Sequence, residues 1–320
     1  MKVVDVAGRE DLARVFVVQM RDEPWSLVEC VGAVDPAQSR ADKLVVVVST
    51  QLGCAVGCPM CDAGTAFHGS LGADEILWEI EHVLREWAGP AWRACKKLKV
   101  QFARMGEPAL NPAVLDVLDQ LPSRLQAPGL MPCIATTAPR SATRWFDRLR
   151  TLRDTHYGHG MFQLQLSVQS TNEAQRDRLI PIAKWDLPTI AEFSRTWVRP
   201  RDRKVTLNFA VTEGVALEPR VLAALFDPAS VTVKLTPLNP TTQAHRNELR
   251  TVFRAGEECR VDELSARIRD AGFDCIVSTG LAEESEMHTS CGQLVLAHRR
   301  TLREEPSRSA EQAPGQGVVW

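Results

Sequence analysis

Three closely spaced cysteines constrain this 320-residue chain more than any other feature. Cys54, Cys58 and Cys61 form a C-x3-C-x2-C pattern, soon after the apolar, β-branched run at 45–48. Such a run is typical of a buried strand, so the pattern predicts three thiolates on a loop at a strand end. Three thiolates do not complete a structural zinc site, which takes four protein ligands. They also leave one iron of a four-iron cluster without a protein ligand.

An iron without a protein ligand is a place for a cofactor or substrate to bind. This arrangement is typical of the radical S-adenosylmethionine (SAM) enzymes, in which the open iron of a [4Fe-4S] cluster holds the methionine part of SAM. The alternatives for a lone C-x2-C are a redox pair, half of a zinc site or coincidence. The combined x3 and x2 spacing is much rarer and favours the cluster. We therefore predict two cofactors, a [4Fe-4S] cluster and S-adenosyl-L-methionine.

The composition indicates which broad classes of protein the chain can belong to. The chain is 44% hydrophobic and 24% charged, which is ordinary for a globular protein with one barrel-sized domain. No apolar run approaches the ~18 residues of a membrane span, and the start of the chain lacks a secretory signal. Nine cysteines without such a signal predict a reducing, cytoplasmic location. The net charge of −2 lacks the strongly basic balance of dedicated nucleic-acid binders.

Strands and helices alternate along the chain from Lys43 onward. Apolar residues at 3–4 spacing predict a helix over 73–87, and about six strand–helix units follow in series. We therefore expect an α/β fold, a partial (β/α)6 barrel over 44–298, with its chemistry at the C-terminal strand ends. Strands near 15–20 and 26–33 predict a small β-hairpin extension over 1–43. The polar composition of 299–320 predicts a disordered tail.

Polar residues follow several of the predicted strands. Gly106 lets a ligand approach the backbone, and the Glu107 carboxylate beside it can accept from the ammonium group of SAM. Thr137 and Ser167 place hydroxyls at the ends of the third and fourth strands. Asn239 offers both a donor and an acceptor to an adenine edge. Each residue also has a structural interpretation, in which it only completes a turn or a local hydrogen bond.

Cys291 stands apart from the other cysteines because Ser290 and Gly292 beside it indicate an exposed loop. That loop follows the last strand and could fold over the barrel mouth. A lone cysteine is nevertheless more often a structural residue than a nucleophile. The remaining cysteines lie mostly within predicted strands or helices, where they are most simply small apolar residues.

Five segments, in order, resemble the radical SAM methylases of ribosomal RNA adenine, the RlmN/Cfr type. The segments are STQLGCAVGCPMC at 49–61, MGEPALN at 105–111, QLSVQSTNEAQRDRLIPI at 165–182, VKLTPLNP at 233–240 and SCGQL at 290–294. Their order and approximate spacing extend over most of the chain. This is highly specific for the branch of the superfamily and less so for the substrate.

The resemblance implies a role for each matching residue. Cys54, Cys58 and Cys61 would ligate the cluster. The SAM site would be lined by Gly106, Glu107, Thr137, Ser167, Val168, Gln169 and Asn239. Cys291 would carry a methyl group: in the family one SAM methylates this thiol, and a methylene radical generated with a second SAM adds to an sp2 carbon. Glu29 matches a family proton acceptor, and a one-electron donor such as flavodoxin or ferredoxin would serve as partner.

The chain also departs from the family pattern at its start. Val47 stands where the family has a second catalytic cysteine, and nothing in the sequence favours Cys30 as a substitute. Only 53 residues precede the first cluster cysteine, too few for the family's N-terminal helical domain together with the hairpin. The chain is therefore interpreted as a shortened member without the second catalytic cysteine.

A further departure concerns the substrate. Glu283, Glu284 and Glu286 lie where the family has a basic stretch, which disfavours contact with a phosphate backbone. We therefore expect a cytoplasmic radical SAM methyltransferase-like enzyme whose substrate is a small molecule of specialised biosynthesis. The first alternative is ribosomal RNA adenine, and the second is a non-catalytic iron–sulfur sensor. The SAM-site residues argue against the sensor, which has no need for such a pocket.

Overall fold

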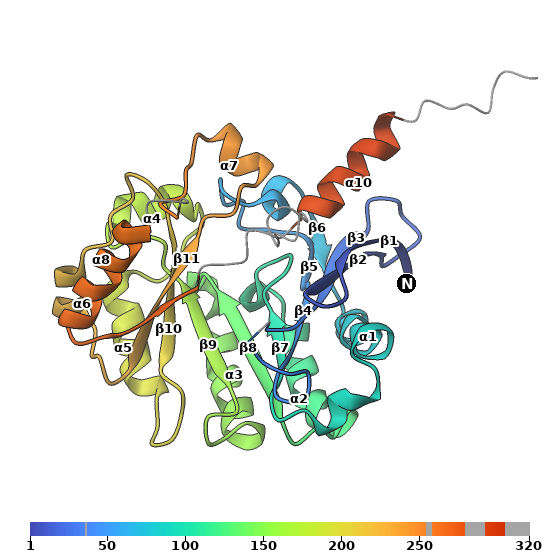
Figure 1. Cartoon of the computed structure of the whole chain (residues 1–320), viewed down its shortest axis with the longest axis horizontal. Helices are drawn as coiled ribbons and strands as arrows, with labels where there is room; N and C mark the ends of the chain where they lie inside the picture. The colour runs from blue at the N-terminus through green and yellow to red at the C-terminus, as the bar shows by residue number, and fades with distance from the viewer. Residues whose placement is uncertain (36, 254–257, 279–291, 305–320) are drawn as a thin grey trace, which may run out of the picture.

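One continuous sheet forms the centre of the protein. The computed structural model describes residues 1–35, 37–253, 258–278 and 292–304. The strand order is β1-β2-β3-β4-β7-β8-β9-β10-β11-β12 (Figure 1). The strands are β1 (Lys2–Arg9), β2 (Ala13–Gln19), β3 (Leu27–Ala33), β4 (Leu44–Val48), β7 (Leu98–Phe102), β8 (Leu130–Thr136), β9 (Gln163–Ser167), β10 (Val205–Val211), β11 (Val231–Pro237) and β12 (Asp274–Val277). From β4 to β12 neighbouring strands pair in parallel, which confirms the predicted partial barrel.

Helices connect the parallel strands and cover the outer face of the sheet (Figure 1). They are α1 (Ala73–Val83), α2 (Ala113–Leu125), α3 (Thr143–His156), α4 (Glu173–Leu179), α5 (Leu187–Trp197), α6 (Pro219–Leu225) and α8 (Glu258–Asp270). Two more, α7 (Thr242–Arg246) and α10 (Gln293–Glu304), lie at the C-terminal end of the strands. No helix in the described ranges is long and apolar enough to cross a membrane.

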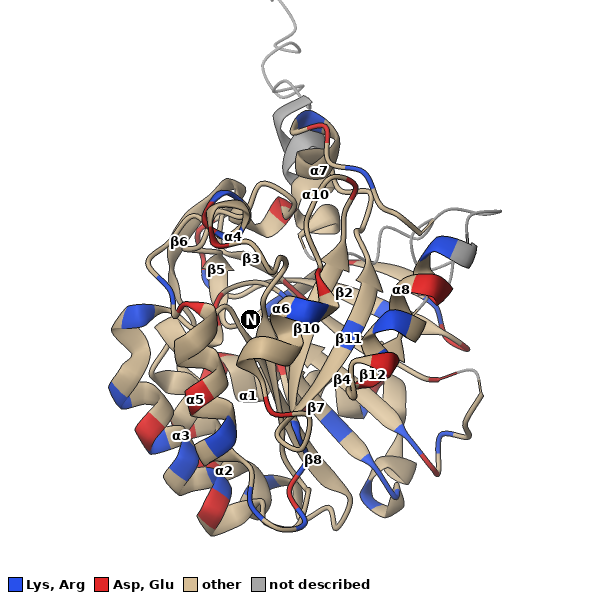
Figure 2. Cartoon of the chain, turned by 90° about the vertical axis from the view of Figure 1, so that its left-hand side faces the viewer, with Lys and Arg blue, Asp and Glu red and all other residues tan. Residues whose placement is uncertain are grey.

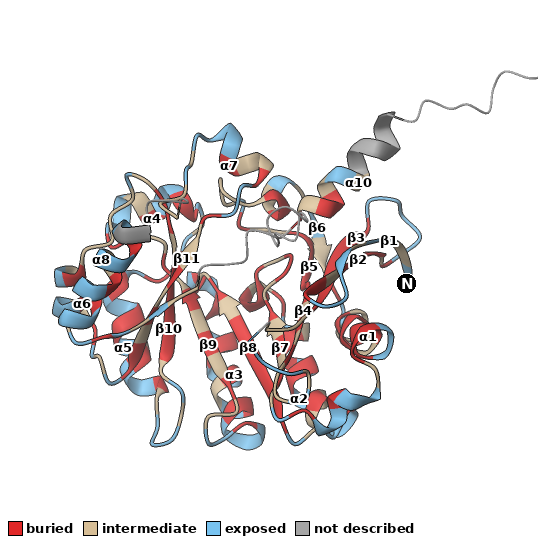
Figure 3. Cartoon of the chain, in the orientation of Figure 1, coloured by how far each residue is buried: buried red, intermediate tan, exposed pale blue. Residues whose placement is uncertain are grey.

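Alternation along each strand separates an apolar outer face from a polar barrel interior. On β7, Leu98 and Val100 are fully buried, whereas Lys99 between them is only half-buried. The β-strand period of two places alternate residues on opposite faces, so the apolar set packs under the helices. Figure 3 shows the result as buried strands beneath helices whose outer sides are exposed. The interior is therefore polar and opens at the C-terminal strand ends.

The N-terminal extension is larger than the predicted hairpin. Its two expected strands are β2 and β3, but β1 adds a third strand at the sheet edge. The extension is also not separate, because β3 pairs antiparallel with β4 and continues the barrel sheet. Strand β1 was not predicted because its sequence, KVVDVAGR, mixes polar and apolar residues without strict alternation. This pattern is possible because most of this edge strand is exposed.

Two helix ends have simple physical explanations. Pro188 lies in the first turn of α5, where a missing N–H costs no hydrogen bond. Helix α10 continues to Glu304, into the segment predicted as a tail. Leucine, arginine and glutamate, which dominate its end, are good helix formers. Residues 305–320 of the predicted tail lie outside the described part.

Charges are mixed on the face shown in Figure 2. Helices α2, α3 and α5 each show basic and acidic residues in this view. Nucleic-acid binding proteins usually gather Lys and Arg into a stripe or patch. On these helices the basic and acidic residues are instead interspersed.

Candidate active site

One pocket at the C-terminal ends of the parallel strands, called the mouth pocket below, brings together almost all the predicted site residues. Its lining includes Cys54, Cys58, Cys61, Gly106, Glu107, Thr137, Ser167, Gln169 and Asn239. Val168 and Glu29, which are both fully buried, do not line the pocket, and Cys291 lies outside the described residues. Gln165, Asn208 and Lys234 line it as well. The sequence interpretation missed these three, although their alternation along β9, β10 and β11 places them on the interior face.

The cysteine loop begins on a small second sheet. After β4 the chain forms β5 (Gln51–Gly53), which pairs antiparallel with β6 (Phe67–Ser70). The Cys54 N–H donates to the Ala66 carbonyl at 3.1 Å, and the Cys61 N–H donates to the Cys58 carbonyl at 3.1 Å. The two strands close the base of the loop and hold its three thiols toward the mouth pocket.

Three thiols line the mouth pocket, the number that leaves one iron of a four-iron cluster without a protein ligand. Among the described residues, no three His, Cys, Asp or Glu side chains lie close enough together to hold one metal ion. Burial raises the pKa of Cys54 to about 11 and that of Cys58 to about 12. A thiol must lose its proton to ligate a metal, so cluster binding has to supply the stabilisation that water does not.

A glutamine and a glycine join the cysteine loop to the end of β7. The Gln51 side-chain oxygen accepts from the Ala55 N–H at 3.2 Å and from the Glu107 N–H at 3.1 Å. Gly106 has φ 102°, and a Cβ there would lie 2.6 Å from the Thr50 hydroxyl oxygen. Only glycine fits this approach and this conformation. The loop and the Gly106 turn therefore form one unit, a role for Gln51 that the sequence interpretation did not assign.

Glu107 is buried in the wall between β7 and β8, with both carboxylate oxygens engaged. One oxygen accepts from the Ala109 N–H at 3.0 Å and from the Thr136 hydroxyl. The other accepts from the Thr137 N–H and hydroxyl, each at 2.7 Å. Burial raises the pKa of Glu107. An ionised carboxylate offers about four acceptor sites, so the protein itself occupies all of them. Glu107 thus fixes the two strand ends in addition to any contact with a ligand.

An aspartate that the sequence interpretation missed fastens α7 to the cysteine loop. Asp62, directly after Cys61, is buried and accepts from the Thr242 N–H at 3.1 Å and the Gln243 N–H at 2.9 Å. The Thr241 hydroxyl donates to the Met60 carbonyl at 2.8 Å. These bonds stabilise the first turn of α7. They also hold the segment after Asn239 against the loop, which brings the two ends of the mouth pocket together.

Glu29 lies beneath the start of α10. Its carboxylate pairs with Arg104 at 2.6 Å and accepts from the Gly292 and Val295 N–H groups, each at 2.9 Å. Gly292 has φ 82°, and a Cβ there would lie 2.5 Å from the Ala63 nitrogen. The start of α10 is thus pressed onto the end of the cysteine loop. The predicted methyl carrier, Cys291, lies outside the described residues, so its role stays a prediction. Glu29 itself anchors the start of α10, in addition to its predicted role as a proton acceptor.

Strand parity shows which of Glu29 and Cys30 lies on the same face as Val47, the position where the family has its second cysteine. Val31 pairs with Val47, so both side chains lie on one face, and Glu29, two residues from Val31, shares it. Cys30 points to the opposite face, is fully buried, and has its pKa raised mainly by that burial. Cys30 therefore does not replace a thiol at position 47.

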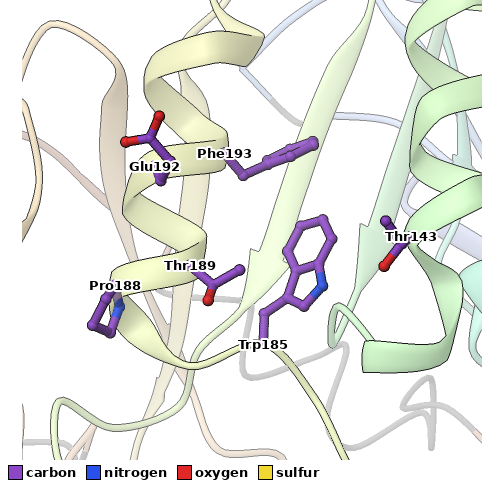
Figure 4. Close-up of a pocket in the computed structure, with 6 residues that line it drawn as sticks. All are labelled: Thr143, Trp185, Pro188, Thr189, Glu192 and Phe193. Carbon is purple, nitrogen blue, oxygen red and sulfur yellow. The ribbon is translucent and has the colours of Figure 1, made fainter.

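A second pocket lies outside the barrel, between α3 and α5 (Figure 4). In that view Trp185 and Phe193 lie side by side, and Thr143 faces them. Pro188, Thr189 and Glu192 complete its lining. It contains none of the predicted site residues, so it is separate from the chemistry of the mouth pocket.

Sequence comparison finds relatives along most of the chain, although no family model matches it. The probable dual-specificity RNA methyltransferase RlmN of Synechococcus sp. is 27% identical over 287 residues, covering 87% of this chain and 74% of that protein. The ribosomal RNA large subunit methyltransferase N of Nitrosopumilus maritimus is 27% identical over 256 residues, covering 78% of this chain and 67% of that protein.

Solved structures support the fold. A radical SAM methyltransferase from Sphaerobacter thermophilus matches with a TM-score of 0.69 at 22% identity, covering 91% of this chain and 80% of that one. SuiB of Streptococcus suis, solved with S-adenosylmethionine bound, matches with a TM-score of 0.52 at 13% identity, covering 76% of this chain and 52% of that one. The resemblance carried by the five sequence segments is thereby confirmed: most of the chain is similar to RNA methyltransferases named RlmN, and its fold matches that of a radical SAM methyltransferase.

Proposed function

We propose that this chain is a radical SAM methyltransferase that transfers a one-carbon unit to an sp2 carbon of an RNA base. The observation that carries the proposal is the mouth pocket, where the cysteine loop and the predicted SAM residues line one space. A [4Fe-4S] cluster would be held by Cys54, Cys58 and Cys61. When bound, it supplies the electron that cleaves SAM.

The pocket geometry supports the remaining proposed roles. The Gly106 backbone lets SAM approach the end of β7, and the fixed Glu107 carboxylate presents a negative charge to its ammonium group. Asn239, on the segment that Asp62 and Thr241 hold to the cysteine loop, faces the adenine end. Cys291 is the proposed methyl carrier. Its chain neighbour Gly292 lies against the loop, which supports that role.

The RNA acceptor rests on the names of the relatives, which are RNA methyltransferases. The sequence had favoured a small-molecule acceptor, and the comparisons do not confirm that preference. The test is to incubate the reconstituted, reduced protein with methyl-deuterated SAM and ribosomal RNA fragments, then analyse the nucleosides by mass spectrometry. A labelled methyladenosine absent from the Cys291→Ala reaction is expected. No labelled base in any fragment would contradict an RNA acceptor.

A small-molecule acceptor is the second candidate, and two observations favour it. Val47 places no thiol on the interior face of β4, so an adduct to Cys291 needs another way of release. The face in Figure 2 also shows mixed charges rather than a basic surface. A filter-binding titration distinguishes the two acceptors. RNA affinity that falls steeply with salt supports the first, whereas no binding at low salt supports the second.

A further inference from the structure

A lysine on the interior wall of the barrel, Lys234, has no assigned role. It lies on β11 between Val233 and Leu235, which are both fully buried beneath the helices. Lys234 has the opposite parity, is half-buried and lines the mouth pocket. In the strand register it lies beside Asn208 of β10, another lining residue. Its ammonium group therefore belongs to the pocket and not to the protein surface.

The positive charge of Lys234 is not balanced within the described part of the chain. No hydrogen bond or ion pair of its ammonium group is found there, and the same holds for Lys99 on β7. Burial lowers the pKa of Lys234, and the charge of Lys99 lowers it further. The acidic group whose charge acts on it is the thiol of Cys133, and burial raises the pKa of that thiol. A thiol with a raised pKa stays protonated at neutral pH, so it supplies no negative charge.

Glu107 is the carboxylate of the same pocket, but it does not balance Lys234. The charges that shift the pKa of Lys234 are those of Lys99, Cys133 and Lys43, and Glu107 is not among them. The barrel wall thus keeps two ammonium groups, Lys234 and Lys99, in a partly desolvated space without a described counter-charge. Such an arrangement disfavours the empty pocket and favours the binding of an anion.

We propose that Lys234 binds an anionic group, a phosphate or carboxylate, of the acceptor substrate, and that Lys99 adds positive potential deeper in the barrel. The only anionic group of SAM is its carboxylate, which lies next to the ammonium group proposed at Glu107 and Thr137 after β7 and β8. Strands β9 and β10 separate that end of SAM from β11, and Asn239 after β11 is proposed to face the uncharged adenine. The acceptor is therefore favoured over SAM as the source of the anion. The inference rests on the proposed function only in taking the mouth pocket as the acceptor site. An RNA nucleotide and a small acidic metabolite share this anionic chemistry.

Acetylation of the lysines tests the site directly in the SAM-saturated, cluster-loaded protein. Trace acetic anhydride labelling, read by mass spectrometry of the peptide containing Lys234, is repeated with inorganic phosphate, succinate and adenosine 5′-monophosphate. An anion on Lys234 raises its pKa, and each pKa unit slows labelling about tenfold. Lys204, which pairs with Asp274 at 2.6 Å, is the internal control and should label at one rate throughout. If none of the three anions slows labelling of Lys234, the proposal is wrong.

Two variants then distinguish the sources of the anion. Calorimetric titration of Lys234→Met should show anion affinity reduced about tenfold or more, the usual range for a lost charge-assisted hydrogen bond, with SAM affinity unchanged. Lys97→Met, a lysine outside the mouth pocket, should leave both unchanged, and Lys234→Arg should retain anion binding. A loss of SAM affinity in Lys234→Met instead would assign Lys234 to the SAM carboxylate and overturn the acceptor site.

The acetylation experiment also distinguishes an acceptor that carries a phosphate from one that carries a carboxylate. Stronger protection by adenosine 5′-monophosphate than by succinate indicates an RNA nucleotide, and the reverse indicates a small acid. Formation of 5′-deoxyadenosine in the same samples reports the proposed SAM chemistry independently. Failure of the anion site is therefore distinguishable from failure of the proposed function.

Discussion

The two walls of the mouth pocket handle buried charge in opposite ways. On the wall at the ends of β7 and β8, the Glu107 carboxylate is surrounded by four protein donors. On the β11 wall, the Lys234 ammonium group has no partner within the described residues, and Lys99 repels it. On the first wall the protein itself satisfies the buried charge before any ligand binds. On the second wall the buried charge is satisfied only when a ligand binds. The contrast separates a preorganised wall, proposed to contact SAM, from a wall that is proposed to bind the acceptor.

The largest expected effect concerns the cysteine loop on which both walls depend. Cys58→Ala removes one of three predicted ligands, so the reconstituted protein should lose its cluster iron and its visible absorption band. Cys275→Ala is the matched control, because Cys275 is half-buried on β12, outside the mouth pocket. Full iron content in the Cys58 variant would contradict the assignment of the loop.

A second fully engaged carboxylate, Glu29, should resemble Glu107 in its response. Glu29→Gln leaves Arg104 without its charge partner and one α10 N–H group facing an amide NH2. Breaking a buried pair typically costs about 3–5 kcal/mol of unfolding free energy. Urea denaturation measures the loss. Glu81→Gln, whose surface pair with Arg124 spans 3.0 Å, is the control and should change stability by less than about 1 kcal/mol. Equal losses in both variants would remove the anchoring role.

Glu107→Gln tests whether the wall at the ends of β7 and β8 depends on the hydrogen bonds of this carboxylate. The amide keeps one acceptor oxygen, but its NH2 group faces either the Thr137 donors or the Ala109 and Thr136 donors. An unsatisfied buried donor costs about 1–3 kcal/mol, so urea denaturation should show destabilisation in that range. Glu192→Gln, at an exposed i,i+3 pair with Arg195, serves as its control. Unchanged stability of the Glu107 variant would mean that its wall is not preorganised.

Lys234→Met should raise the stability of the protein, unlike the two glutamate variants, and its effect should be the smallest of the four. Removing an uncompensated, partly buried ammonium group relieves a desolvation cost of about 1.4 kcal/mol for each unit by which the folded protein lowers its pKa. We therefore expect slightly raised stability in thermal unfolding without added anions. Phosphate should stabilise the natural protein more than this variant. A variant less stable than the natural protein would indicate that Lys234 already has a partner.

Local patterns in the sequence were sufficient for the barrel and the cysteine loop. Strand alternation and helix spacing depend on neighbouring residues, and the cysteine spacing fixes three ligands on one loop. The parity of β11 also indicated that Lys234 faces the interior, because Val231, Val233 and Leu235 form the buried set. This signal was present but was not used.

Contacts between distant segments could not be predicted from the sequence. Glu29 reaches the N–H of Gly292, 263 residues away, and no local pattern encodes that bond. Likewise, the saturation of Glu107 requires the Thr136–Thr137 end of the next strand to lie against it. The edge strand β1 was missed because exposure removes the alternation on which strand prediction depends.

The most direct test of the account is SAM cleavage by the reduced, cluster-loaded protein. Under anaerobic conditions with dithionite, chromatography should detect 5′-deoxyadenosine from SAM, because the account places cluster and SAM in one mouth pocket. Cys58→Ala should form none, whereas Cys275→Ala should match the natural protein. A cluster-loaded protein that binds SAM but releases no 5′-deoxyadenosine would contradict the central claim.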